Sequence, residues 1–308
     1  MTAAEPLDAP ERVRVTVPGK INLALMVGGR RADGYHELAT LFQAVSLYDE
    51  VTATPAKDIT CTVTGAVARQ VGPMEQNLAY RAARLLRTEL GVREGVHLSL
   101  TKRIPVAGGM AGGSADGAAA LLACARLWDL RLAQEDLYDL AASLGADVPF
   151  ALMGGCAVGL GRGERLTPAL SRGTYHWVLA IANQGMSTPA VFARFDELNP
   201  GPVPAPVVPP ALMMALAAGD PVRVGAALAN DLWPAAYSLN PSLQTTLAAG
   251  RAAGAIGAIV SGSGPTVALL APDAAAATDL AVELSTREVA HEVRVVTGPV
   301  PGATVLPG

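Results

Sequence analysis

The stretch PVAGGMAGGSAD, residues 105–116, is rich in bare backbone, because four glycines and three alanines occupy seven of its twelve positions. An alternating apolar run at 96–102 predicts a strand before it, and the alanine-rich run from Ser114 predicts a helix with Ser114 at its N-cap. Glycine permits positive φ and a close approach to the backbone. A strand, a glycine-rich loop and a helix start together form an anion site, usually for phosphate.

Two common phosphate motifs do not match this loop. The Walker pattern requires a lysine after its last glycine, where this chain has Ser114 and Ala115. The dinucleotide pattern GxGxxG is absent from GGMAGG. From the loop alone, an alternative stays open: glycine and alanine merely allow tight helix packing.

Composition narrows the class of protein. The chain has 308 residues, of which 51% are apolar and 16% charged, so it has the composition of a packed globular protein. Its net charge of −4 argues against nucleic acid as a partner, since such binders carry a basic face. A phosphate ligand would then be held by backbone N–H groups rather than by a basic patch.

Cysteines and termini indicate the compartment. Cys61, Cys124 and Cys156 are far apart and form no CxxC pair, which favours buried thiols in a reducing compartment. The first residues lack the pattern of a signal peptide, and no apolar run approaches about 20 residues. We therefore expect a cytoplasmic protein with no membrane partner.

The hydrophobic patterns mix helices and strands without regular alternation, which favours an α+β fold. We divide the chain into a flexible tail at 1–10, an N-terminal domain at 11–170 and a C-terminal domain at 171–308. Six prolines in PGPVPAPVVPP, residues 200–210, exclude a helix or a central strand and predict a stiff surface connection in the C-terminal domain.

Local patterns predict further elements. Several short strands are expected within 38–65, and helices at 77–90 and 133–144. Pro18-Gly19 is expected to interrupt an alternating strand that resumes at Lys20. Side chains two apart in a strand point the same way, so Lys20 and Asn22 should project from one face.

The glycine loop does not stand alone. It resembles the phosphate loop of the GHMP kinases, which are small-molecule kinases named for galactokinase, homoserine kinase, mevalonate kinase and phosphomevalonate kinase. VPGKINLALMV (17–27) resembles the first motif of that family, and SGSGPTVALL (261–270) resembles its third. These three motifs occur in the family's order, and the resemblance extends over about residues 20–270.

Within the family, further segments resemble the members that phosphorylate a cytidine diphosphate alcohol in the non-mevalonate isoprenoid pathway. They are DGYHEL (33–38), NLAYRAARLL (77–86) and GADVPFAL (145–152). The resemblance implies an α+β kinase with two domains and an active site in the cleft between them. It also implies ATP with Mg²⁺ as co-substrate, no tightly bound organic cofactor, and direct in-line transfer. It leaves the oligomeric state open, a homodimer included.

The resemblance assigns catalysis to two residues. Asp147 matches the general base, and Lys20 matches the neighbouring lysine that keeps this base ionised. Asn22 would bind substrate or Asp147. Without the motifs, Asp147 would be interpreted as a helix cap before Pro149, and Lys20 as an ordinary exposed lysine of a strand.

The remaining roles also follow from the resemblance. Ser114 is placed to reach Mg²⁺, while Lys102 and Asn77 are candidates for the adenine side. The ATP-binding residues are Pro105, Val106, Ala107, Gly108, Gly109, Met110, Ala111, Gly112, Gly113, Ser114 and Ala115.

Tyr35 and His36 are expected to bind the cytosine, one by stacking and the other by hydrogen bonding. Phe192 is expected to stack on the opposite side of the base, with Phe195 as the alternative. Ordinary packing is the competing interpretation of an isolated Tyr-His pair. The helix arginines Arg81, Arg84 and Arg87 are interpreted as a solvated face.

Two rival functions stay open at this point. One is a GHMP kinase that acts on a different small alcohol. The other is a nucleotide-binding relative that has kept the fold without being an enzyme. The presence of both Lys20 and Asp147 argues against the second.

Overall fold

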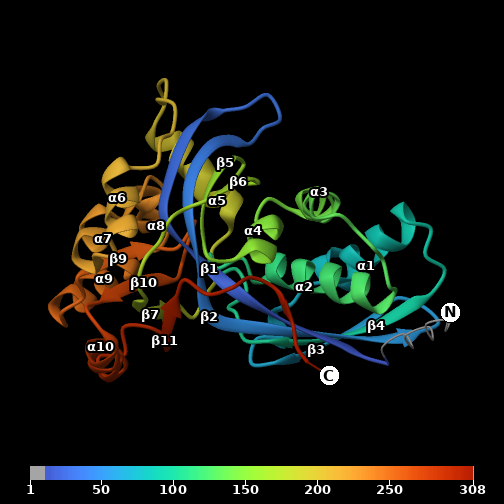
Figure 1. Cartoon of the computed structure of the whole chain (residues 1–308). Coiled ribbons are helices and arrows are strands. Elements are labelled where there is room, and N and C mark those ends of the chain that lie inside the picture. Colours follow the sequence, from blue (N-terminus) through green and yellow to red (C-terminus); the bar gives the residue numbers. More distant parts are fainter. Residues whose placement is uncertain (1–10, 308) are drawn as a thin grey trace.

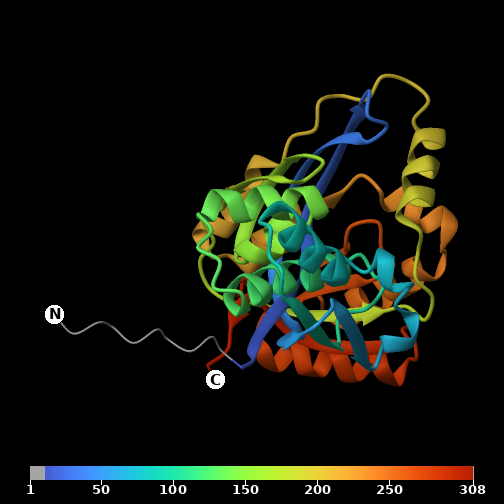
Figure 2. The same cartoon turned by 90° about the vertical axis from the view of Figure 1, so that its right-hand side faces the viewer.

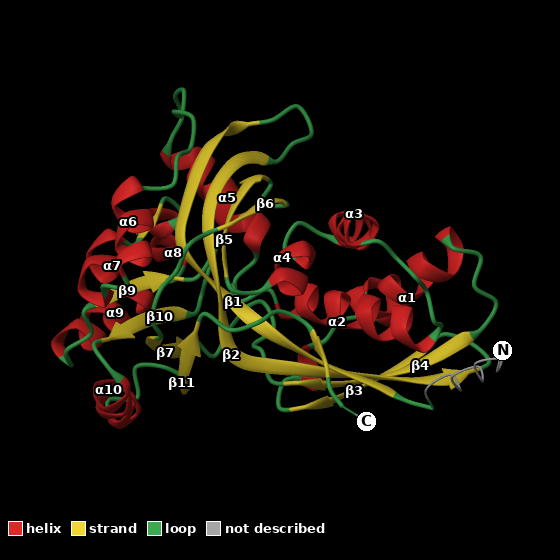
Figure 3. Cartoon of the chain, in the orientation of Figure 1, coloured by secondary structure: helices red, strands yellow, loops and turns green. Residues whose placement is uncertain are grey.

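The structure is a computed structural model that describes residues 11–307. Its larger sheet has eight strands, with the order β12–β1–β2–β4–β3 along one path and β5, β6 and β8 attached beside it (Figure 3). The strands are β1 (Val13–Arg30), β2 (His36–Ala56), β3 (Thr60–Gly65), β4 (Gly95–Lys102), β5 (Cys156–Gly161), β6 (Arg165–Pro168), β8 (Ala229–Asn230) and β12 (Thr304–Val305).

β1 and β2 are long, bent strands that form one antiparallel hairpin (Figure 1). The prediction that Pro18-Gly19 interrupts the first strand is wrong. The prediction of several short strands within 38–65 is also wrong, because β2 runs without a break to Ala56 and only β3 follows it. The pairing shifts register at Pro18/Gly19, at Asn22/Ala24 and at Val27/Arg30. Such bulges bend a strand without ending it. β1 and β2 therefore stay paired along their length while they bend.

Helices from the first half lie on one face of this sheet (Figure 1). They are α1 (Leu78–Glu89), α2 (Gly112–Leu127), α3 (Gln134–Leu144) and α4 (Val148–Met153), preceded by the short helices η1 (Ala68–Gln70) and η2 (Met74–Gln76). α2 lies at the centre of this layer, where it packs on α1, α3, α4, β1 and β2. Its alanine-rich surface is buried on nearly all sides, because small side chains let neighbouring elements approach closely.

The start of α2 differs from the prediction. The helix begins at Gly112, and its N-cap is Ala111, which has a left-handed conformation (φ +57°) and makes no side-chain cap. Ser114 therefore lies inside the first turn, and the prediction that it is the N-cap is wrong. Gly112 and Gly113 themselves adopt helical geometry, which extends the helix toward the loop.

The second sheet has four antiparallel strands in the order β11–β7–β10–β9. They are β7 (Tyr175–Ile181), β9 (Gly257–Val260), β10 (Val267–Ala271) and β11 (Glu292–Gly298). α9 (Ser242–Ala252) and α10 (Ala274–Thr286) pack on this sheet. The other helices of this half are α5 (Thr188–Leu198), α6 (Pro210–Ala218), α7 (Pro221–Ala227) and α8 (Trp233–Leu239).

The proline-rich segment behaves as its composition predicts. Residues 201–209 contain no helix or strand, and α6 begins at Pro210, where a missing N–H costs no helix hydrogen bond. The segment passes beside the β1–β2 hairpin (Figure 2), and a Cβ on Gly28 would lie 2.6 Å from Pro206 Cδ. Pro206 therefore packs closely on that hairpin at Gly28.

The division of the chain at 170/171 stays a prediction. It falls between β6 and β7, which belong to different sheets, but β8 and β12 from the second half both pair with β1. The tail at 1–10 lies outside the described residues. Cys124 and Cys156 are buried, and Cys61 is half-buried. Across residues 11–307, the structure has no helix of the length and apolar character that crossing a membrane requires.

Candidate active site

The glycine loop joins β4 to α2 and packs directly on a second glycine turn. Gly109 has a φ of +77°, and a Cβ there would lie 2.0 Å from the Ser261 carbonyl oxygen, so only glycine fits. The Ser261 hydroxyl donates a hydrogen bond to the Gly109 carbonyl at 2.9 Å. The Asn230 amide donates to the Val260 and Gly262 carbonyls, at 2.8 Å each. The turn at 261–264 is thereby fixed and supports the loop from behind.

The start of α2 faces open space. Gly113 is exposed, and a Cβ on it would meet no atom within 4 Å. The first turn of a helix has N–H groups without helical partners and the positive end of the helix dipole. Ser114 lies in this turn and lines the same space. The local geometry therefore suits an anion.

A cavity of about 960 Å³ connects this loop with the other predicted site residues and receives side chains from both halves of the chain. It contains Lys20, Asn22, Tyr35, His36, Pro105, Ala107, Gly108, Gly109, Ala111, Gly112, Gly113, Ser114, Asp147 and Phe192 among its lining residues. Gly262 and Ser263 of the third motif also line the cavity, so it brings together residues from all three sequence motifs.

Some of the predicted loop residues do not reach this cavity. Met110 and Ala115 are buried in the hydrophobic core, and Val106 lies outside the lining. The loop alternates between core and cavity, so only part of its side chains face the cavity, and ATP binding by these three residues stays a prediction that concerns their backbone.

The two predicted adenine-side residues are also outside the cavity. Lys102 is buried in ion pairs with Asp49 and Asp116, and Asn77 caps α1 by accepting a hydrogen bond from the Ala79 N–H at 2.9 Å. Arg81 is exposed, as the interpretation of a solvated face predicts, and it also lines the cavity.

Lys20 lies on β1 with its side chain buried against the loop. Its Nζ donates to Asn22 Oδ1 at 2.7 Å and to the Gly109 carbonyl at 3.0 Å, and it lies 3.8 Å from Asp147 Oδ2. Burial lowers the pKa of Lys20, while the negative charge of Asp147 opposes this shift. The Asn22 amide donates to Thr40 Oγ1 at 2.8 Å, which fixes its carbonyl toward the lysine.

Asp147 occupies the N-cap position of α4, as the capping interpretation predicted, but its side chain makes no capping hydrogen bond. Pro149 follows in the first turn, so one backbone donor that a cap would satisfy is missing. The carboxylate is 30% exposed and lines the cavity beside Lys20. It is therefore available to a ligand rather than used by the helix.

An aromatic group forms the other end of the cavity. The rings of His36 and Phe192 stack with centroids 5.1 Å apart, and Tyr35 is 57% exposed at the rim. Phe195 contacts His36 edge-on but is buried and does not line the cavity. His36 Nε2 lies 2.7 Å from Asp196 Oδ1, a partner that the sequence analysis missed.

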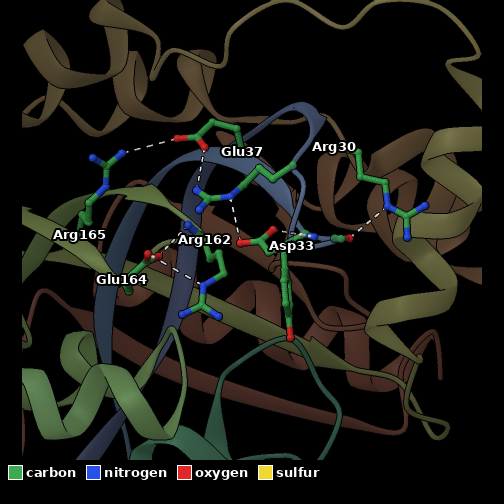
Figure 4. A network of polar contacts seen from close by, with 9 residues as sticks. Arg30, Asp33, Glu37, Arg162, Glu164 and Arg165 are labelled. Atoms are coloured by element: carbon green, nitrogen blue, oxygen red, sulfur yellow. Dashed lines mark hydrogen bonds and ion pairs between the residues drawn. The ribbon is translucent and has the colours of Figure 1, made fainter.

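A network of arginine and acidic side chains surrounds this end (Figure 4). Arg162 lies with its Cζ 5.3 Å from the centre of the Tyr35 ring, and it lines the cavity together with Arg30. Arg31 donates to Glu37 at 2.9 Å, and Arg165 pairs with the same carboxylate. The sequence analysis missed Arg30 and Arg162, although glycines flank Arg162 in GLGRGERL, a pattern that exposes a side chain at a turn.

Comparison with known proteins extends this picture. The family model described as GHMP kinases N terminal domain matches residues 77–155, and that described as GHMP kinases C terminal matches residues 212–290. A protein of Streptomyces avermitilis named 4-diphosphocytidyl-2-C-methyl-D-erythritol kinase is 55% identical over 295 residues, which are 96% of this chain and 99% of that protein.

Solved structures agree. A crystal structure of 4-(cytidine 5'-diphospho)-2C-methyl-D-erythritol kinase is 36% identical with a TM-score of 0.74, over 92% of this chain and 98% of that one. A homoserine kinase from Cytophaga hutchinsonii has a TM-score of 0.75 at 19% identity, over 99% of this chain and 100% of that one, a likeness in fold. Sequence and structure together confirm the α+β fold class, and the chain belongs to the GHMP kinase family.

Proposed function

We propose that this protein transfers the γ-phosphoryl group of ATP to a hydroxyl of 4-diphosphocytidyl-2-C-methyl-D-erythritol, which gives the 2-phosphate in the non-mevalonate isoprenoid pathway. The observation that carries the proposal is one cavity in which the glycine loop, the Lys20–Asp147 pair and the aromatic group of Tyr35, His36 and Phe192 meet. The S. avermitilis relative with this name supports the choice of alcohol.

The loop and the start of α2 would bind the phosphates of ATP. The free N–H groups of the first turn, near Gly112 and Gly113, are donors for phosphate oxygens, and the helix dipole favours their negative charge. Residues 105–115 form the predicted ATP-binding segment, mostly through their backbone. In phosphoryl transfer, positioning and charge stabilisation do most of the work of the protein.

Asp147 would act as the general base. Its carboxylate accepts the proton of the alcohol as the oxygen attacks the γ-phosphorus, so a new P–O bond forms while the bond to the bridging oxygen of ADP breaks. Lys20 lies 3.8 Å from this carboxylate, where its positive charge would stabilise the oxygen of the alcohol as its proton leaves. Asn22 holds the lysine in place through the 2.7 Å contact.

ATP in this family carries Mg²⁺, and the cavity offers oxygen donors that suit it. The Ser114 hydroxyl lines the cavity at the first turn of α2, and hard cations prefer oxygen ligands. This residue would hold the ion together with the phosphates. When bound, Mg²⁺ neutralises part of the phosphate charge.

The aromatic end of the cavity would bind the cytidine. The exposed ring of Tyr35 and the half-buried ring of Phe192 offer flat apolar faces for a base, and His36 offers a hydrogen-bonding ring beside them. Phe192 is the better candidate for the second stacking residue because Phe195 does not line the cavity. Because both substrates are charged metabolites, we assign the protein to the cytoplasm. We also keep the division of the chain into two domains at 11–170 and 171–308.

A panel of alcohols tests the proposal. The purified protein is incubated with ATP, Mg²⁺ and each of the cytidine diphosphate alcohol, mevalonate and homoserine, and the product mass is measured. We expect ADP and a singly phosphorylated product only with the cytidine diphosphate alcohol. Turnover of mevalonate or homoserine alone would favour a different GHMP kinase, and turnover of none would favour the non-enzymatic relative.

A further inference from the structure

Three charged side chains lie buried beneath the phosphate loop and outside the cavity: Asp49, Lys102 and Asp116, which are 0%, 2% and 3% exposed. Lys102 Nζ forms ion pairs with Asp49 and with Asp116, the latter at 2.8 Å. Charged residues are almost never fully buried unless they are paired. None of the three has a part in the chemistry proposed above.

Asp49 holds the chain where it enters the loop. Its Oδ1 accepts hydrogen bonds from the N–H groups of Arg103 and Ile104, at 2.5 and 2.9 Å. Asp49 itself lies in the long strand β2, so the end of β4 is attached to the neighbouring strand through a side chain rather than a ladder hydrogen bond. The loop begins at the next residue, Pro105.

Lys102 holds the chain where it leaves the loop. Its Nζ donates to the carbonyl of Gly112, the first residue of α2, at 3.1 Å. A Cβ on Gly112 would lie 3.2 Å from this Nζ and 3.0 Å from Ile104 Cγ2, so a side chain there would crowd the contact. One ion pair, Asp49–Lys102, therefore connects both ends of the loop.

A buried ion pair contributes little net stability, because the loss of hydration offsets the attraction between its charges. A glycine-rich loop, in contrast, gains from being fixed before its ligand arrives, since N–H donors act best when they need no rearrangement. Ala107 and Ala111 have positive φ values of +51° and +57°, which confirms that the surroundings impose the shape of this loop.

We propose that Asp49 and Lys102 are positioning residues for ATP: their ion pair fixes the distance between the entry of the glycine loop and the start of α2, so that the N–H groups of this segment can grip the phosphates. The inference rests on the proposed function in so far as it places ATP at this loop.

The variants Asp49→Asn and Lys102→Met test this role, with Asp116→Asn as a matched control. Asp49→Asn and Asp116→Asn each replace a carboxyl group that contacts Lys102 Nζ with an amide, but only Asp49 contacts the entry of the loop. The principal measurement is the affinity for the β,γ-imido analogue of ATP by titration calorimetry. This measurement does not depend on turnover. Circular dichroism shows whether each variant is folded.

We expect Asp49→Asn and Lys102→Met to weaken binding of the analogue and to raise KM for ATP, each about tenfold, because small displacements of positioned groups have large effects. KM for the alcohol should stay within about twofold, as should the analogue affinity of Asp116→Asn. This pattern differs from general damage, which would affect both substrates.

Three results would overturn the inference. The first is folded Asp49→Asn and Lys102→Met proteins that bind the analogue as tightly as the wild type. The second is an equal loss in Asp116→Asn, which would show that losing any carboxyl partner of Lys102 has this effect, whether or not that partner contacts the loop. The third is that neither test variant folds, which would leave the pair a purely structural element. A wild type that binds the analogue but phosphorylates none of the alcohols would instead refute only the proposed function.

Discussion

The ammonium group of Lys20 lies 3.8 Å from the carboxylate of Asp147, although one residue belongs to the bulged strand β1 and the other precedes the short helix α4. The same ammonium group donates a hydrogen bond to the Gly109 carbonyl in the glycine loop. A single cation thus connects the candidate base with the candidate ATP site. This arrangement leads to the first prediction.

Asp147→Asn should lower kcat by about 10³-fold, because an amide of the same shape cannot accept the proton of the alcohol. Affinity for the β,γ-imido analogue of ATP should stay within about twofold, since the start of α4 does not depend on a cap from this side chain. A coupled ADP assay and calorimetry measure the two quantities. Retention of kcat within about tenfold would exclude Asp147 as the base.

Gly113→Ala should fold normally yet bind ATP weakly. Its new methyl group would meet no protein atom within 4 Å but would project at the exposed start of α2, where the phosphates are expected. We predict an unchanged melting temperature and at least about tenfold weaker binding of the ATP analogue, because the N–H groups could no longer be approached closely.

Gly109→Ala is the contrasting variant. Its methyl group would lie 2.0 Å from the Ser261 carbonyl, at a backbone φ of +77°. We therefore expect a clear drop in melting temperature by differential scanning calorimetry, of about 5 °C or more.

Normal binding of the ATP analogue by Gly113→Ala would argue that the phosphates lie elsewhere.

Phe192→Ala and Phe195→Ala should separate recognition from packing. Phe192 lines the cavity and stacks on His36, so its removal should raise KM for the cytidine substrate about tenfold with little change in stability. Phe195 is buried, and its removal should lower the free energy of unfolding by about 3 kcal/mol or more. Steady-state kinetics and urea unfolding give the two readouts, and the reverse pattern would assign the stacking role to Phe195.

The titration of Asp116 should affect how the free energy of unfolding depends on pH. Burial raises the pKa of this carboxyl to about 8, with Lys102 opposing the shift and Asp49 adding to it. The folded protein then keeps a proton that the unfolded chain releases near its ordinary pKa of 3.8. Stability from this group is present below about pH 4 and is lost as the pH rises toward 8.

Asp116→Asn removes this titration. The free energy of unfolding of the variant relative to the wild type should therefore rise between about pH 4 and 8, by at most about 1.4 kcal/mol per pH unit. Urea unfolding at several pH values measures the difference. Parallel pH profiles would show that Asp116 is already ionised in the folded protein at low pH.

Local periodicity accounts for much of what could be predicted. The two-residue period of a strand placed Lys20 and Asn22 on one face, and their side chains form a hydrogen bond of 2.7 Å. The same period contains a signal that was missed: Lys102 follows Val96, Leu98 and Leu100 on the buried face of β4. A lysine in that register is expected inside the protein, where the structure has it.

By itself, the chain determined the order of its motifs, the glycine positions that permit a phosphate loop, and the face of each strand, because these depend on backbone preference and on neighbours a few residues away. Only the tertiary structure decided that Asp49 is the partner of Lys102, that Asp196 is the partner of His36, and that Phe192 rather than Phe195 lines the cavity. Those choices depend on how distant elements pack, and a local pattern gives the direction of a side chain but not what it meets.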